Sequence, residues 1–138
     1  MLGHILFESG RAAAAVAPLR KAVSLAPHEP LITGALGRAL LSLNDPALDA
    51  EALSALEKAT VSRPESVVLR DLATAYARAG REGEAALATA ERFMLQGGMR
   101  DSLRHANHAL EKLPTGSPGW FKADDIRTTA ERALNGKG

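Results

Sequence analysis

Apolar residues recur in this chain at spacings of 34 and 37 residues, and this repeat constrains the fold more than any other feature. The recurrences are Leu2 with Leu36, Gly3 with Gly37 and Leu6 with Leu40, then Ala15 with Ala52, Leu19 with Leu56, Ala22 with Ala59 and Pro27 with Pro64. A third copy begins at Leu72, Ala73 and Tyr76. A period of this length matches two antiparallel helices and their turn, so the sequence predicts a stack of similar helical hairpins.

The composition favours helices over strands. The 138 residues include 27 Ala and 20 Leu but only five Val and three Ile, and β-branched residues are the ones that suit strands. We therefore expect an all-α fold and one domain over residues 1–138, with about eight helices. The expected helices span 1–9, 12–26, 30–43, 46–62, 66–79, 82–96, 99–113 and 118–134, with turns at Gly10, Gly80 and Gly97-Gly98.

The recurring residues resemble the signature of the tetratricopeptide repeat family along the whole chain. In such repeats small residues lie where the two helices of a hairpin come closest, and proline ends the second helix. The resemblance implies a right-handed α-α superhelix. Its hairpins would span 1–26, 30–62, 66–96 and 99–134. The small residues expected to be buried between helices are Ala15, Ala22, Ala52 and Ala59.

The last expected helix begins with a strong start signal. Ser117 is placed as the N-cap and Pro118 as the first helical residue. Apolar residues then follow at spacings close to one helical turn, from Trp120 and Phe121 to Leu134. We expect this helix to pack on the preceding one, burying Trp120 and Phe121, and to cover the open end of the stack.

Residues 80–126 resemble the end of one group more closely, the bacterial zinc metallopeptidases of the beta-barrel assembly-enhancing protease type. The likeness rests on residues 113–120 (LPTGSPGW) and 123–126 (ADDI), and on residues 85–88 (AALA) before Gln96-Gly97. Those enzymes join an HExxH catalytic domain to tetratricopeptide repeats. This chain has no HExxH, so no catalytic residue can be carried over. The resemblance implies a non-catalytic C-terminal fragment of a longer protein, with zinc only in the missing catalytic domain.

The charge balance and the absence of cysteine exclude several classes of function. The 17 basic and 16 acidic residues give a net charge of +1, whereas proteins that bind nucleic acid through phosphates carry a basic excess. The chain has no Cys, which removes disulfides and thiolate chemistry. It also lacks an apolar run of the ~20 residues needed to span a bilayer. We expect neither nucleic-acid binding nor membrane insertion.

Two groups of side chains could suggest a metal site. His105 and His108 are three residues apart on one expected helix, but no third ligand is evident nearby. Asp124 and Asp125 fall in the first half of the last helix, where carboxylates favour the positive end of the helix dipole. The sequence therefore predicts surface histidines, a stabilised helix start, and no tightly bound zinc or other cofactor.

The remaining function is recognition of a protein or peptide. By register, the side chains expected on the concave face are His4, Phe7, Glu8, Leu31, Gly34, Arg38, Leu41, Val67, Arg70, Thr74 and Arg78. The guanidinium groups of Arg38, Arg70 and Arg78 suit a peptide carboxylate or acidic segment, or they simply solvate a curved surface. The residues leave both interpretations open.

Three functions follow from these observations. The first is the C-terminal interaction module of a periplasmic zinc metallopeptidase, which would hold a substrate or partner near the catalytic domain. The second is a free-standing adaptor that scaffolds a complex in the cytoplasm or the envelope. The third, an enzyme in its own right, has no catalytic constellation in the sequence to support it.

Overall fold

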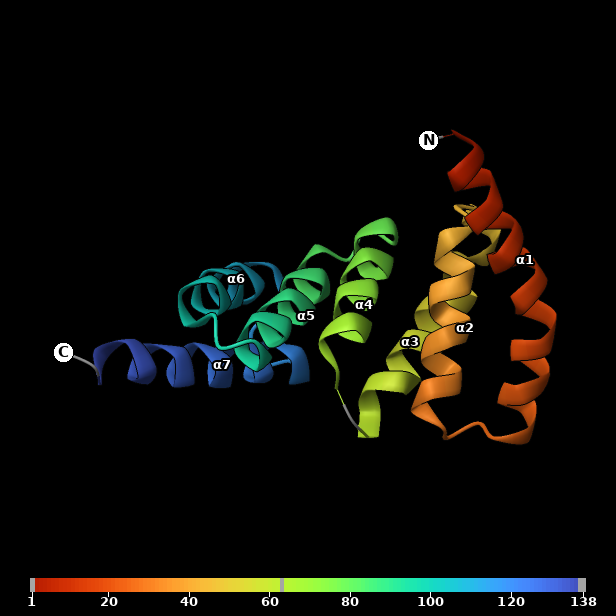
Figure 1. The fold of residues 1–138 in the computed structure, drawn as a ribbon. Helices are drawn as coiled ribbons and strands as arrows, with labels where there is room; N and C mark the ends of the chain where they lie inside the picture. The colour runs from red at the N-terminus through yellow and green to blue at the C-terminus, as the bar shows by residue number, and fades with distance from the viewer. Residues whose placement is uncertain (1, 63, 137–138) are drawn as a thin grey trace. The chain divides into compact units, whose positions relative to one another are not determined.

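A computed structural model describes residues 2–62 and 64–136, without the side chains of residues 2–9 and 62. Within these ranges every regular element is helical and no strand occurs, which confirms the all-α prediction (Figure 1). The elements are α1 (Leu2–Leu25), α2 (Pro30–Ser42), the short 3-10 helix η1 (Pro46–Leu48), α3 (Asp49–Ser62), α4 (Ser66–Arg78), α5 (Glu82–Leu95), α6 (Met99–Lys112) and α7 (Pro118–Asn135). The handedness of a superhelix stays a prediction.

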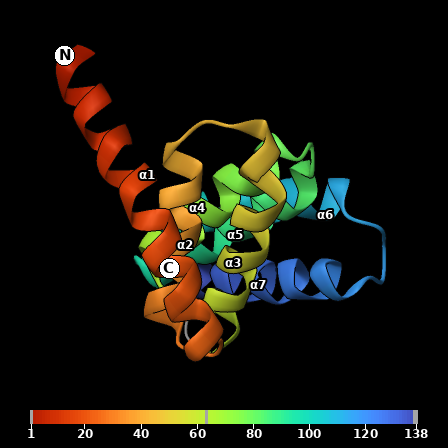
Figure 2. The same ribbon diagram turned by 90° about the vertical axis from the view of Figure 1, so that its right-hand side faces the viewer.

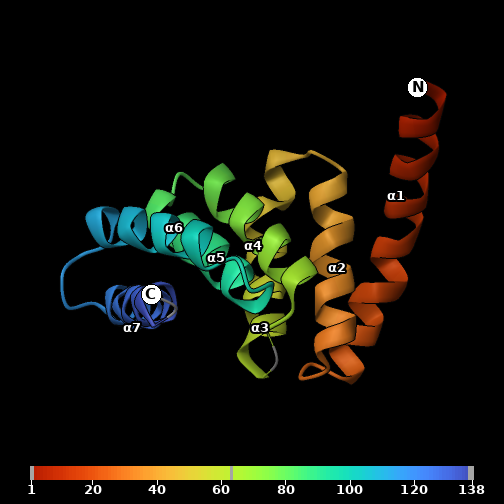
Figure 3. The same cartoon turned by 60° about the vertical axis from the view of Figure 1, so that its left-hand side comes forward.

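The chain divides into two compact units, Met1–Pro64 and Glu65–Gly138, which we describe separately. In the first unit α2 packs against both α1 and α3 (Figure 3). Contact on both sides explains why seven of its thirteen residues are buried, while only a narrow stripe remains exposed. The helix that the repeat places first in its hairpin is thus the central helix of this unit.

Gly37 of α2 lies directly against Leu56 of α3. A Cβ atom added at Gly37 would lie 2.5 Å from Leu56 Cγ. Ala52 and Ala59, on the same helix as Leu56, have exposed fractions of 0% and 1%. The prediction that small recurring residues lie between helices is confirmed here.

The other two alanines of that prediction, Ala15 and Ala22, are only half-buried. Their helix, α1, packs along one face of α2 and leaves its opposite face to solvent. A double hydrogen bond also ties α1 to α3: Arg20 Nε and Nη2 donate to the Glu51 carboxylate at 2.9 and 2.7 Å. The bond from Arg20 lowers the pKa of Glu51.

The expected turn at Gly10 is wrong, because α1 continues from Leu2 to Leu25. Two expected helices, 1–9 and 12–26, are therefore one, and the described residues form seven α-helices rather than eight. A single glycine costs a helix only about 1 kcal/mol relative to alanine. Arg11 and the four alanines that follow it are strong helix formers, so the helix continues through the glycine.

Replacing Gly10 with alanine should therefore stabilise the protein. Apart from the local helix backbone, no atom lies within 4 Å of a Cβ added there, so the change gains helix propensity of up to about 1 kcal/mol without a clash. Gly80→Ala is the matched control: it has equal space but a φ of +74°, which disfavours any residue with a Cβ. Thermal unfolding should show a higher melting temperature for Gly10→Ala and a lower one for Gly80→Ala. A lower melting temperature for both variants would indicate that Gly10 lies in a turn after all.

In the second unit α5 packs against α4, α6 and α7. Small residues make this possible, since Gly83, Ala86, Ala88 and Ala90 of α5 are all buried. Buried Ser102 of α6 donates its hydroxyl hydrogen to the carbonyl oxygen of Ala90 at 2.8 Å. The alanine-rich composition thus serves close packing around a central helix.

Helix ends follow the predicted glycines and prolines. Gly80 and Gly97 adopt positive φ angles of +74° and +80°, each two residues beyond the last residue of α4 and α5. The prolines Pro27, Pro64 and Pro114 lie two residues beyond the last residues of α1, α3 and α6. Each expected stop other than Gly10 is therefore confirmed, because neither proline nor a left-handed glycine continues the helical hydrogen bonding.

The start of α7 matches its prediction in detail. Residues 113–117 form the corner between α6 and α7 (Figure 2). The Trp120 amide donates to Ser117 Oγ at 3.2 Å, and Pro118 occupies the first helical position. Trp120 packs against a buried cluster made of Ala86, Leu87, Ala109, Leu113 and Ala123.

Phe121, by contrast, is not buried as expected. Its ring is 55% exposed and contacts Trp120 edge-on at 5.2 Å between centroids. Consecutive helical residues point about 100° apart, so only one of the two can face the core. The exposed side of α7 also carries Lys122, Asp125 and Arg132. A polar outer side is what a capping helix requires.

Candidate binding surface

The predicted concave face in the first unit is only partly exposed. Leu31 is 74% exposed and Arg38 is also exposed, but Leu41 is 8% exposed and Gly34 is buried. Because α2 packs on both sides, its solvent stripe runs through Leu31, Ala35, Arg38 and Ser42 instead. Assigning Leu41 and Gly34 to the binding face was wrong by one helical position. The predicted residues His4, Phe7 and Glu8 lie outside the described side chains.

The second unit presents the predicted residues as one exposed stripe along α4. Val67, Arg70, Thr74 and Arg78 are all exposed and follow one another at three- and four-residue steps. We call these four residues the α4 stripe. Thr74 donates its hydroxyl hydrogen to the Arg70 carbonyl at 3.2 Å, and Arg70 Nε lies 3.8 Å from Asp71 Oδ1. The stripe therefore offers an aliphatic side chain and two guanidinium groups on a solvent face.

The two histidines of α6 turn to different partners. His108 Nε2 lies 2.9 Å from Glu82 Oε1 of α5, and Lys112 Nζ lies 3.9 Å from Glu82 Oε2. His105 instead stacks on Phe93, with ring centroids 5.5 Å apart and an angle of 9°. Within residues 2–62 and 64–136 no three His, Asp or Glu side chains converge as a metal site.

The aspartates of α7 serve the helix itself. Arg127 donates to Asp124 Oδ1 from Nε at 3.0 Å and from Nη2 at 2.7 Å. Asp125, the next residue, is exposed. Asp124 is therefore engaged in an ion pair within α7. The expected stabilisation of the helix start by the helix dipole stays a prediction.

Arg92, Phe93 and His105 form a stack that was not predicted from the sequence, which we call the Phe93 stack. The Arg92 guanidinium carbon lies 4.7 Å from the Phe93 ring centroid. Arg92 Nε is buried and has no hydrogen-bond partner among the described atoms. Burial lowers the pKa of His105, and the positive charges of Arg104, Arg92 and, when it is protonated, His108 act in the same direction. Phe93 itself, an aromatic residue in the last turn of α5, is the one signal that could have indicated a packed helix end.

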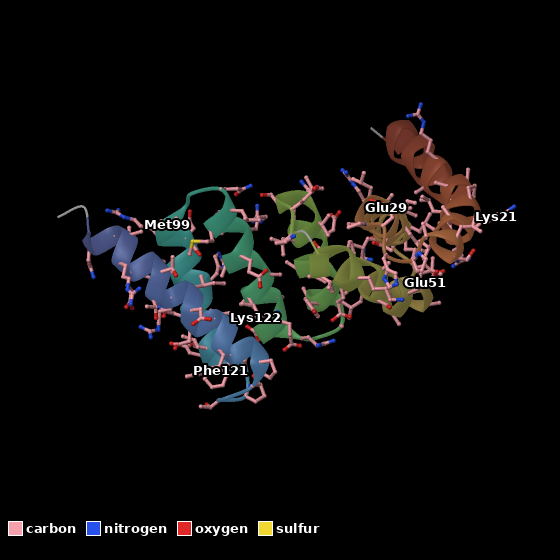
Figure 4. The ribbon with its side chains drawn as sticks, turned by 90° about the horizontal axis from the view of Figure 1, so that it is seen from below. Lys21, Glu29, Glu51, Met99, Phe121 and Lys122 are labelled. Atoms are coloured by element: carbon pink, nitrogen blue, oxygen red, sulfur yellow. The ribbon has the colours of Figure 1, made fainter. Side chains whose placement is uncertain are left out.

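A half-buried carboxylate on α5 was also missed. Burial raises the pKa of Glu91, and the nearby ammonium group of Lys122 opposes that shift. Lys122 projects from α7, next to Phe121 (Figure 4). The alanines that precede Glu91 could have indicated that its carboxylate is half-buried, since a helix rich in buried alanine has neighbours on several sides.

No protein-family model matches the chain, and no curated protein is significantly similar to it. The likeness to tetratricopeptide repeats and to the metallopeptidase group therefore stands on the residues quoted above. None of the helices in the described part of the chain is long and apolar enough to cross a membrane.

Proposed function

We propose that this chain is a non-catalytic repeat module of the tetratricopeptide type that binds a protein or peptide. One observation carries the proposal: the recurring small residues are used for helix contact, while the predicted binding residues of α4 stay in solvent. Gly37 and Ala52 are buried at the α2–α3 contact, whereas Arg70 and Arg78 are exposed. A scaffold with an exposed basic stripe is suited to an acidic or carboxylate-bearing segment.

We further propose that the module is the C-terminal part of a periplasmic zinc metallopeptidase. Residues 113–120 and 123–126, which carry that resemblance, form the corner after α6 and the first half of α7. Zinc would then belong to the catalytic domain. The alternative is a free-standing adaptor in the cytoplasm or envelope. The coding sequence upstream of Met1 discriminates between the two, because the first proposal requires an HExxH segment and a signal peptide there.

The α4 stripe can be tested with a fluorescent acidic peptide that has a free C-terminal carboxylate. We expect Arg70→Ala to weaken its binding about tenfold, which corresponds to about 1.4 kcal/mol for one lost charge-assisted contact. The melting temperature should hardly change, because the side chain is exposed. Fluorescence anisotropy measures the first quantity and thermal unfolding the second.

Arg132→Ala is the matched control, since this arginine is exposed on α7 and lies outside the stripe. It should leave the affinity unchanged. Equal weakening by both substitutions would show nonspecific attraction and contradict a site on α4. Peptidase activity of the isolated chain with added zinc, abolished by a chelator, would contradict the non-catalytic part of the proposal.

A further inference from the structure

The Phe93 stack lies at the junction of α5 and α6. Gly98 donates its amide hydrogen to the Phe93 carbonyl at 2.8 Å, and Gly97 donates to the Met94 carbonyl at 3.2 Å. A Cβ added at Gly98 would lie 3.4 Å from Phe93 Cδ1. The phenyl ring is thus packed against the turn that joins the two helices, and His105 of α6 lies flat against that ring.

The charges around His105 are mostly positive. Arg92 approaches from α5, and Arg104 and His108 flank it on α6, while Asp101 is the one acidic group that acts on it. Asp101 is itself 3.3 Å from Arg104 Nη2. The remaining carboxylate on the facing side of α5, Glu82, contacts His108 and Lys112. A proton added to His105 would therefore enter a site whose nearby carboxylates, Asp101 and Glu82, are already paired with other groups.

We propose that the Phe93 stack is a pH-sensitive latch that holds the first half of α6 against the end of α5. The neutral imidazole stacks on Phe93 and closes the latch. The imidazolium cation would be less well solvated there than in the open state, and it would be repelled by Arg92, whose guanidinium group lies over the Phe93 ring. Protonation therefore favours a state in which His105 leaves the ring and the α5–α6 contact opens.

The direction of the pH dependence follows from linkage. The pKa of His105 is lowered from 6.5 in the folded state, so the open or unfolded state binds the proton more readily. The stabilising effect of the closed latch is complete above about 6.5, the ordinary pKa of histidine. It is lost as the pH falls below that value toward the folded-state pKa, by up to about tenfold in the opening equilibrium per pH unit.

The test compares wild type with His105→Phe, which keeps an aromatic ring for the stack and removes the proton site. Hydrogen exchange is followed by NMR at the amides of buried Ser102 and Ala106, and protection factors correct for the intrinsic pH effect. In wild type we expect protection to fall by up to about tenfold per pH unit below about pH 6.5. In His105→Phe it should stay constant. His28→Gln, which removes an exposed histidine from the first unit, should behave like wild type.

A second variant keeps the proposal testable if His105→Phe does not fold. Arg92→Gln removes one of the cations that repel the imidazolium, so the NMR titration midpoint of His105 should move to higher pH. An unchanged midpoint in Arg92→Gln would overturn the latch. So would a midpoint at or above 6.5 in wild type, or the same pH profile for wild type and His105→Phe.

Discussion

Gly37→Val is expected to lower the free energy of unfolding of the first unit by about 3 kcal/mol, the upper part of the range for overpacking a core. An added Cβ would meet Leu56 Cγ at 2.5 Å and Leu56 Cδ2 at 2.7 Å, with the Ala52 carbonyl oxygen at 3.3 Å. The backbone of α3 limits how far Leu56 can retreat, since Leu56 is itself fully buried. Chemical denaturation monitored by circular dichroism measures the loss.

A double mutant separates this steric effect from the loss of helix quality that valine alone could cause. Leu56→Ala by itself should also destabilise, by about 2–5 kcal/mol for a buried leucine. Combined with Gly37→Val, it makes room for the new methyl groups, so the double mutant should lose less than the sum of the two single changes. Additive losses would mean that the two residues do not meet, and the α2–α3 register would be wrong.

Trp120→Ala is the second substitution with a large expected effect. The indole packs on the buried cluster that joins α5, α6 and α7, but it is only half-buried. We therefore expect a loss of about 3 kcal/mol, at the lower end of the range for a buried aromatic residue. Scanning calorimetry should show a marked fall in melting temperature.

Phe121→Ala is the control within the same helix turn. Its ring is more than half exposed, so its removal should cost less than about 1 kcal/mol. Equal melting temperatures for Trp120→Ala and wild type would rule out α7 as an intramolecular cap. The helix would then be an arm that packs on another chain or domain.

The positions of the helices could be predicted because their ends are set by local chemistry. Pro27, Pro64 and Pro114 lack an amide hydrogen, and Gly80 and Gly97 adopt backbone angles that other residues disfavour. These effects act within a few residues and need no knowledge of neighbouring helices. The burial of Gly37 and Ala52 could likewise be predicted, because the repeat places these small residues where the two helices of a hairpin meet.

The faces of the helices were harder to predict, since exposure depends on how many neighbours a helix has. Leu41 was assigned to the binding face on the assumption of one packing side, and contact of α2 with both α1 and α3 buries it. The turn predicted at Gly10 was wrong for a different reason. The strong helix formers that flank Gly10 outweigh the cost of one glycine, so α1 continues through it.

Side-chain contacts between helices that do not involve the recurring residues could not be predicted from the sequence. Glu82 meets His108 from 26 positions away, and Phe93 meets His105 across the α5–α6 turn. Both pairs depend on the angle at which α6 returns along α5. That angle is set by the packing of Ser102 on the Ala90 carbonyl and of the neighbouring alanines, which is a tertiary property.

The packing around α5 has a consequence for how the chain forms during synthesis. Among the described helices, those in substantial contact are consecutive along the chain, with the exception of α5 and α7. A chain of such local contacts is expected to fold quickly, in microseconds to milliseconds, because little entropy is lost in closing each loop. Each hairpin can therefore assemble as soon as its second helix leaves the ribosome. The α5–α7 contact differs, because α5 has to wait for a partner that is made two helices later.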